Sequence, residues 1–150
     1  MSFEEKLAWV SLLVGVVVPA AYFGVVLRPL GEVPVADIAY QRPLLVAVGA
    51  SIVLTIVGAI LMAIGTGISS ELSGRKAEDD IDRKDERDLH IGRRGDLAGY
   101  YVASAGALGV MALVMLEVDH FWIASALYLS FAVASLVSGV VKVVAYRRGF

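Results

Sequence analysis

The chain has 150 residues, of which 58% are hydrophobic, and its formal net charge is −2. Soluble domains have about 45–50% apolar residues, so this composition indicates a membrane protein. The negative charge argues against direct binding of nucleic acid. Because the sequence has no cysteine, disulfides, thiolate catalysis and cysteine-based metal sites are excluded. The length suits a single membrane domain, residues 1–150.

The first half of the chain holds two apolar stretches, at about 6–27 and 43–69. Each exceeds the roughly 20 residues that a membrane-spanning helix needs. The first is not read as a signal peptide, because Glu4 and Glu5 stand where a basic region belongs and the apolar run is too long. Prolines and a glycine between the two stretches predict an irregular connector at 28–42.

The second half of the chain holds two more apolar stretches, at about 97–116 and 121–146. Together they are too long for one span, so the polar break at Glu117–His120 predicts a tight turn between antiparallel helices. The apolar runs lack the period-two alternation of a membrane barrel. The sequence therefore predicts an all-α fold, an integral membrane four-helix bundle.

Residues 70–96 form a segment crowded with both signs of charge. Opposite charges recur four residues apart, as at Asp79–Arg83 and Asp80–Lys84, which favours a solvated helix. Gly74 and Gly92 are expected to interrupt this helix.

The distribution of basic residues predicts the orientation. Eleven of the 13 Lys and Arg residues lie in the termini and the central segment, and only Arg28 and Arg42 lie on the other side. Cytoplasmic loops carry the excess of Lys and Arg, so both termini and residues 70–96 are expected in the cytoplasm. Aromatic residues near the predicted span ends are expected to form interfacial belts: Trp9, Tyr22, Tyr40, Trp122 and Tyr146.

Small residues recur every four positions in the later spans and predict close helix packing within one chain or between copies. A pore or substrate path is the alternative interpretation of these stripes. The rows are Ser51, Thr55, Ala59, Ala63, Gly67 in span two, Gly95, Gly99, Ala103, Ala107 in span three, and Ala126, Ser130, Ala134, Ser138 in span four.

Lys142 is the charged residue that lies deepest in a predicted span. Either its long side chain extends to the headgroups, or it faces the bundle interior on the same row as Ser138. No ionisable residue stands in the middle of a span, which argues against a proton-coupled transporter.

Two groups of residues have the composition of a metal site. Asp82, Glu86 and His90 follow one another at four-residue spacing and would share a helix face, while Glu117, Asp119 and His120 cluster at the turn. A charged, solvated linker and a polar surface turn, with Asp119 capping the last span, are the alternative interpretations. No catalytic motif is present, so we expect neither an enzyme nor a bound cofactor.

The stretch DERDLHIGRRG at 85–95 resembles a pattern in a family of small uncharacterised prokaryotic membrane proteins, in which D-E-R and then I-x-x-R-G precede the last helix pair. The resemblance implies a four-helix fold in the inner membrane and no known activity. Some family members are encoded beside small helix-turn-helix regulators, which implies a regulatory partner. The residues that match the motif are Asp85, Glu86, Arg87 and Arg94, and His90 falls outside the pattern.

These observations predict a non-enzymatic protein that acts by interaction. Its charged cytoplasmic segment, with Asp85, Glu86, Arg87 and Arg94 as candidate binding residues, would dock a cytoplasmic protein or another copy of the chain. A small channel or transporter built from several subunits is the alternative, motivated by the small-residue stripes. An enzyme acting on lipid lacks a recognisable catalytic set.

Overall fold

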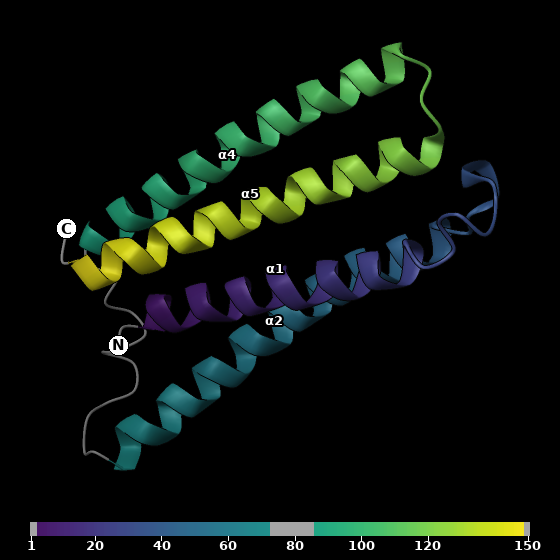
Figure 1. The fold of residues 1–150 in the computed structure, drawn as a ribbon. Helices are drawn as coiled ribbons and strands as arrows, with labels where there is room; N and C mark the ends of the chain where they lie inside the picture. The colour runs from purple at the N-terminus through teal and green to yellow at the C-terminus, as the bar shows by residue number, and fades with distance from the viewer. Residues whose placement is uncertain (1–2, 73–85, 149–150) are drawn as a thin grey trace.

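The computed structural model describes residues 3–72 and 86–148, with only the backbone described at 3–4, 66–72 and 86–87. These residues form four long helices and one short 3₁₀ helix (Figure 1). In chain order they are α1 (Phe3–Val26), η1 (Val35–Asp37), α2 (Gln41–Leu72), α4 (Glu86–Met115) and α5 (His120–Arg148).

All four long helices contain a stretch that is long and apolar enough to cross a membrane. The all-α prediction of a four-helix bundle is therefore confirmed, and the chain has the architecture of a multi-pass membrane protein. The spans are Glu5–Val26, Gln41–Gly65, Asp88–Met115 and His120–Arg148.

The charged segment differs from the expectation. Residues 70–72 continue α2 and residues 86–96 form the start of α4, while 73–85 lie outside the described residues. Gly92 lies inside α4 without ending it, so the predicted interruption there is wrong. Gly74 lies outside the described residues. A single interior glycine costs a helix only roughly 1 kcal/mol relative to alanine, which is too little by itself to end α4.

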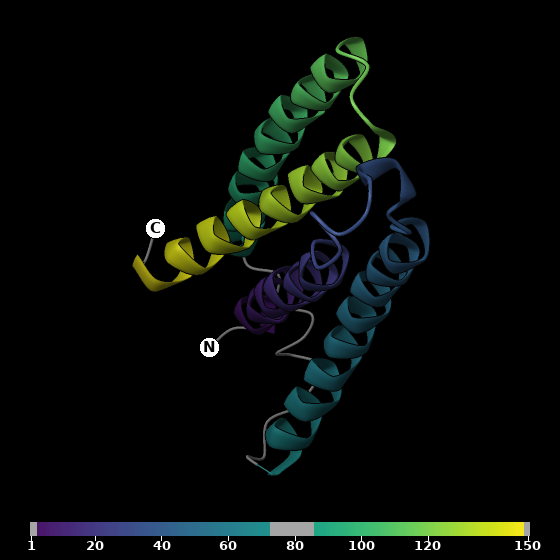
Figure 2. The same ribbon diagram turned by 45° about the vertical axis from the view of Figure 1, so that its right-hand side comes forward.

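The four long helices are arranged as a row in the order α4, α5, α1, α2 (Figure 2). Helices α4 and α5 form an antiparallel hairpin, α1 packs against α5, and α2 packs against α1. Helices α2 and α4 occupy opposite ends of the row, so the four helices do not close into a ring.

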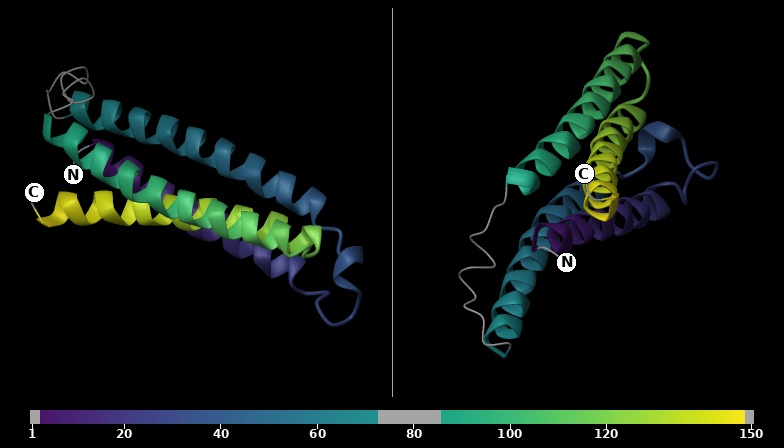
Figure 3. Two further views of the ribbon diagram at one scale, coloured as in Figure 1. Left: turned by 90° about the horizontal axis from the view of Figure 1, so that it is seen from above. Right: turned by 90° about the vertical axis from the view of Figure 1, so that its left-hand side faces the viewer.

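The helix ends gather at two opposite ends of the molecule (Figure 3). We call one the charged end: it holds the start of α1, the start of α4 and the end of α5. The connector end holds the two connections, residues 27–40 and 116–119. The first connection is irregular, as predicted, and consists of turns and η1.

The buried core lies toward the connector end. Phe121 is 1% exposed and contacts Tyr40 with a ring-centroid distance of 5.7 Å. Tyr22 is 3% exposed, and its hydroxyl lies 3.2 Å from that of Ser125. The prediction that Tyr22 belongs to an interfacial belt is therefore wrong, because its ring packs edge-on against Tyr128 inside the bundle.

The turn between α4 and α5 is tight, as predicted. Glu117, the second residue after the end of α4, adopts a left-handed backbone (φ 52°). The N–H of Glu117 donates to the carbonyl of Val114 and that of Val118 to the carbonyl of Leu113, which satisfies the last carbonyls of the helix. Asp119 then stands at the N-cap of α5, since its carbonyl accepts from the N–H of Trp122 at 2.9 Å.

Small residues bring α4 and α5 into close contact. A Cβ at Gly99 would lie 3.0 Å from the carbonyl oxygen of Ala134 and 3.1 Å from Cβ of Ser138. The predicted rows of spans three and four therefore meet here. Farther along, the close approach is at Gly106, opposite Ser130, rather than at Ala107.

In α2 a close contact with α1 lies at Gly58, which is outside the predicted row: a Cβ there would meet the side chain of Val10. Ser51 and Thr55 of the predicted row line a cavity. Only the backbone of Gly67 is described.

A candidate binding site at the charged end

The depth of each side chain follows from the helix lengths. A hydrocarbon core of about 30 Å corresponds to about 20 residues at roughly 1.5 Å per residue. Counted back from Met115, this length reaches Asp96 on α4, and counted on from His120 it ends just before Lys142 on α5. On this count, Asp96 and Lys142 are expected at the depth of the lipid headgroups, with residues 86–95 beyond it.

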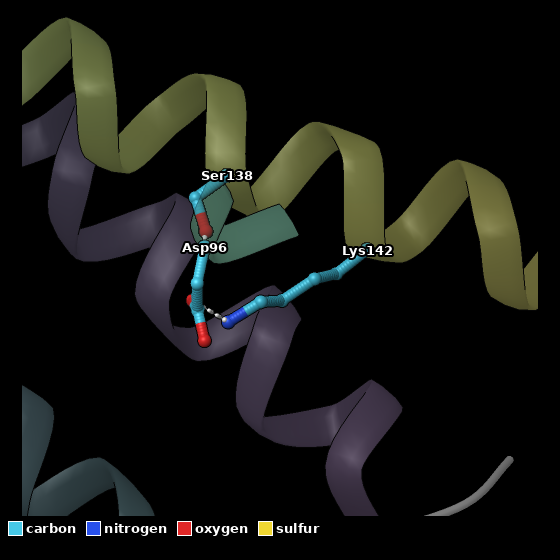
Figure 4. A network of polar contacts seen from close by, with 3 residues as sticks. All are labelled: Asp96, Ser138 and Lys142. Carbon is cyan, nitrogen blue, oxygen red and sulfur yellow. Dashed lines mark hydrogen bonds and ion pairs between the residues drawn. The ribbon is translucent and has the colours of Figure 1, made fainter. Parts of the chain in front are cut away.

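Asp96 and Lys142 form an ion pair between α4 and α5 (Figure 4). Nζ of Lys142 donates to Oδ1 of Asp96 at 2.7 Å, and the hydroxyl of Ser138 donates to the same oxygen at 3.4 Å. The side chain of Lys142 is 26% exposed and that of Asp96 is 70% exposed. A pair this exposed stabilises the fold by only about 0.2–1 kcal/mol.

Of the two interpretations of Lys142, the structure has the side chain facing the neighbouring helix, on one row with Ser138. Gly95 makes this direction sterically accessible. A Cβ at Gly95 would lie 2.7 Å from Cε of Lys142, so any larger residue would occupy the space of the lysine stem. The ion pair thus depends on a glycine in α4.

A cavity of about 230 Å³ lies beside this ion pair, between α1, α4 and α5. We call it the charged-end cavity. Its walls carry one carboxylate, one ammonium and several hydroxyls, from Asp88, Lys142, Ser11, Ser135, Ser138 and Tyr146. Leu7, Ala8, Gly92 and Gly139 complete the lining. Trp9 and Arg147 join α1 to α5 at the same end, with the guanidinium 5.4 Å from the ring centre.

A second cavity, of about 360 Å³, lies deeper between α1, α2 and α5. We call it the inner cavity, and it shares Ser11 and Ser135 with the first. Its polar groups are hydroxyls, and no charged residue lines it. The Ser51 hydroxyl donates to the carbonyl of Ala47 at 2.9 Å, and the Thr55 hydroxyl donates to the carbonyl of Ser51 at 2.7 Å.

The inner cavity also contacts two places where hydrogen bonding is incomplete. Tyr128 lines it, and among the described residues the buried Tyr128 hydroxyl has Ser51 as its neighbouring hydroxyl but makes no hydrogen bond of good geometry. Pro19 lines it too and has no N–H to donate to the carbonyl of Gly15. These groups make the inner cavity more polar than its apolar walls suggest.

The residues that match the motif do not converge on either cavity. Arg94 is exposed on α4, outside the lining of both. Glu86 and Arg87 form the first turn of α4, where only the backbone is described, and Asp85 lies outside the described residues. What the structure adds is Asp88, the next residue after Arg87 in the first turn of α4, which is half-buried and lines the charged-end cavity.

Only the set at the turn, Glu117, Asp119 and His120, has all its side chains among the described residues, and it does not form a metal site. In the part of the chain that the structure describes, no three His, Asp or Glu residues gather in a way that could hold a metal ion. Glu117, Asp119 and His120 are all exposed at the turn. In the other set, His90 is exposed on α4 and Asp82 lies outside the described residues.

Sequence reasoning missed the pairing of Asp96 with Lys142. A signal was present, because the two residues stand almost equally far along the chain from the turn at Glu117–Asp119. In an antiparallel hairpin such residues lie at the same level, where opposite charges can meet. No family model, no curated protein and no solved structure matches the chain.

Proposed function

We propose that this protein is a non-enzymatic protein of the prokaryotic inner membrane, with both termini in the cytoplasm, and that it binds an acidic surface of a cytoplasmic protein. The observation that carries the proposal is the unbroken course of α4 from charged Glu86 to apolar Met115. The excess of Lys and Arg at the charged end supports the orientation.

The projecting start of α4 offers a surface suited to such a partner. Arg93 and Arg94 are exposed, and next to them Leu89 is 48% exposed. Asp96, the nearest described carboxylate along the helix, is already paired with Lys142. Among the described side chains, Arg93 and Arg94 therefore carry the unpaired charge on this face, which favours an acidic partner and makes salt weaken the complex.

Binding at this surface would act on the membrane part directly. Helix α4 is about 45 Å long at roughly 1.5 Å per residue, and it contains no proline. Gly95 and Gly99 hold it close against α5. A partner that tilts or rotates the start of α4 therefore displaces the whole hairpin, as a regulatory interaction requires.

A photocrosslinking side chain at position 90, where His90 is exposed one turn before Arg94, tests the proposal in native membranes. We expect a crosslinked protein that disappears with Arg93→Glu plus Arg94→Glu and at high salt. Arg28→Glu, an exposed charge at the connector end, is the matched control and should leave the crosslink intact. A crosslink insensitive to both the charge reversal and salt would contradict an acidic partner.

The residues that match the motif permit a second test. Charge reversal at Arg87 should weaken co-purification of an acidic partner, whereas charge reversal at Asp85 and Glu86 should not weaken it. Unchanged co-purification of the Arg87 variant would remove the motif from the proposed binding surface.

A small oligomeric channel or transporter is the second candidate, and the inner cavity is the observation that favours it. Hydroxyl groups line this cavity and no charged residue does, which suits a neutral polar solute. Flux of a panel of ions and neutral solutes into liposomes tests this candidate. Flux that Ser135→Phe blocks would support it, and no flux for any solute would refute it.

A further inference from the structure

The charged-end cavity presents both signs of charge within a small volume. Asp88 on α4 and Lys142 on α5 line the same space of about 230 Å³. Asp88 is half-buried, and the structure has no ion pair to it among the described residues. A half-buried carboxylate without a counter-charge is unfavourable, so a cationic group is the natural complement to Asp88.

Lys142 is positioned to bind an anion at the same time. An ammonium has three N–H donors, and the contact with Asp96 uses one of them. That contact fixes the direction of the lysine side chain, and since Asp96 is 70% exposed it does not enclose the ammonium. The hydroxyls of Ser11 and Ser135 line the same cavity and can donate to the anion.

The depth of the cavity indicates where its ligand comes from. Asp96 and Lys142 are expected at headgroup depth, and Leu7 and Ala8 form an apolar wall on α1. A headgroup can enter the cavity there while its acyl chains remain in the bilayer. At about 30 Å³ per water molecule, the space equals seven or eight waters, the size of a small headgroup.

We propose that the charged-end cavity binds a lipid headgroup in which a primary ammonium is joined to a phosphate, as in phosphatidylethanolamine. The phosphate accepts hydrogen bonds from Lys142 and the serine hydroxyls, and the ammonium donates to Asp88. A purely anionic headgroup would leave Asp88 unpaired beside it. A choline headgroup has no N–H to donate. This lipid site is separate from the protein-binding surface at Arg93 and Arg94.

Native mass spectrometry of the purified protein, titrated with defined lipids, tests the site. We expect phosphatidylethanolamine to bind about tenfold more tightly than phosphatidylcholine or phosphatidylglycerol. This difference corresponds to the one charge-assisted hydrogen bond from the lipid ammonium to Asp88. Asp88→Asn should remove this preference. Lys142→Gln should weaken binding of both phosphatidylethanolamine and phosphatidylglycerol, because it removes the phosphate contact.

Asp119→Asn is the matched control, since it removes an exposed carboxylate at the connector end. It should leave the preference for phosphatidylethanolamine intact. Equal binding of the three lipids, tighter binding of phosphatidylglycerol, or a preference that survives Asp88→Asn would overturn the proposal. Soluble glycerophosphoethanolamine separates the two sources of the headgroup: much weaker binding than the lipid supports a lipid ligand, and equal binding would overturn it.

Discussion

Gly95 on α4 lies against the aliphatic stem of Lys142 on α5, so closely that a Cβ at position 95 would come 2.9 Å from the carbonyl oxygen of Ser138. This contact joins helix packing to the ion pair. The missing side chain lets the two backbones approach, and the approach places the ammonium at Asp96. A larger residue at position 95 would therefore disturb both the packing of α4 on α5 and the ion pair.

Gly95→Ala should destabilise the fold by about 1–3 kcal/mol, because the added methyl group meets backbone that cannot move aside cheaply. Unfolding in mixed micelles with rising SDS, followed by fluorescence of Trp9 and Trp122, measures the change. Gly109→Ala is the matched control: nothing lies within 4 Å of a Cβ there, so we expect no loss of stability. Equal effects at the two glycines would show that close packing at Gly95 is unimportant.

The coupling between Asp96 and Lys142 should be small. A double-mutant cycle with Asp96→Asn and Lys142→Gln should give a coupling free energy of about 0.2–1 kcal/mol, since Asp96 is 70% exposed. The same cycle at high salt should give less, because ions screen an exposed pair. A coupling of several kcal/mol, or one that salt leaves unchanged, would mean that the pair is shielded from water.

Glu117→Gly should stabilise the protein by about 0.5–1 kcal/mol. Glu117 adopts a left-handed backbone that glycine occupies without steric cost. Glu117→Ala serves as the control, because it removes the carboxylate and keeps the steric cost. If both variants stabilised the protein equally, charge at the turn rather than backbone conformation would be the cause.

Tyr22→Phe should cost about 0.5–1.5 kcal/mol, because it leaves the buried hydroxyl of Ser125 without its partner at 3.2 Å. Tyr101→Phe removes a hydroxyl from a ring that is 64% exposed and should have no effect on stability. The SDS titration measures both variants. A neutral result for Tyr22→Phe would show that Ser125 finds another partner.

Helix number and position were predictable because hydropathy and length alone decide whether a segment can span a bilayer. The contact of Gly99 with Ala134 and Ser138 was also within reach, since small residues at four-residue spacing mark a smooth face. The choice between Gly106 and Ala107, and between Gly58 and the row through Ser51, was not. Those contacts depend on which helix lies opposite and on the angle at which the two helices cross. The periodicity of one helix specifies neither.

The candidate site was predictable only in part. The sequence offered the bundle interior as one direction for Lys142, but not its partner. Asp96 was grouped with the charged segment because composition changes at that residue, whereas the helix continues through it. Tyr22 was misplaced for a related reason: nearness to a span end indicates depth in the membrane, and it says nothing about which face of the helix the residue occupies.

The order of the row has a consequence for how the protein is made. Each hairpin, α1 with α2 and α4 with α5, joins spans that follow one another in the chain, so each can form as soon as it is inserted. The two hairpins then meet along the seam between α1 and α5, where both cavities lie. The two cavities therefore form only when the two hairpins meet, and a molecule bound in either cavity would hold the hairpins together.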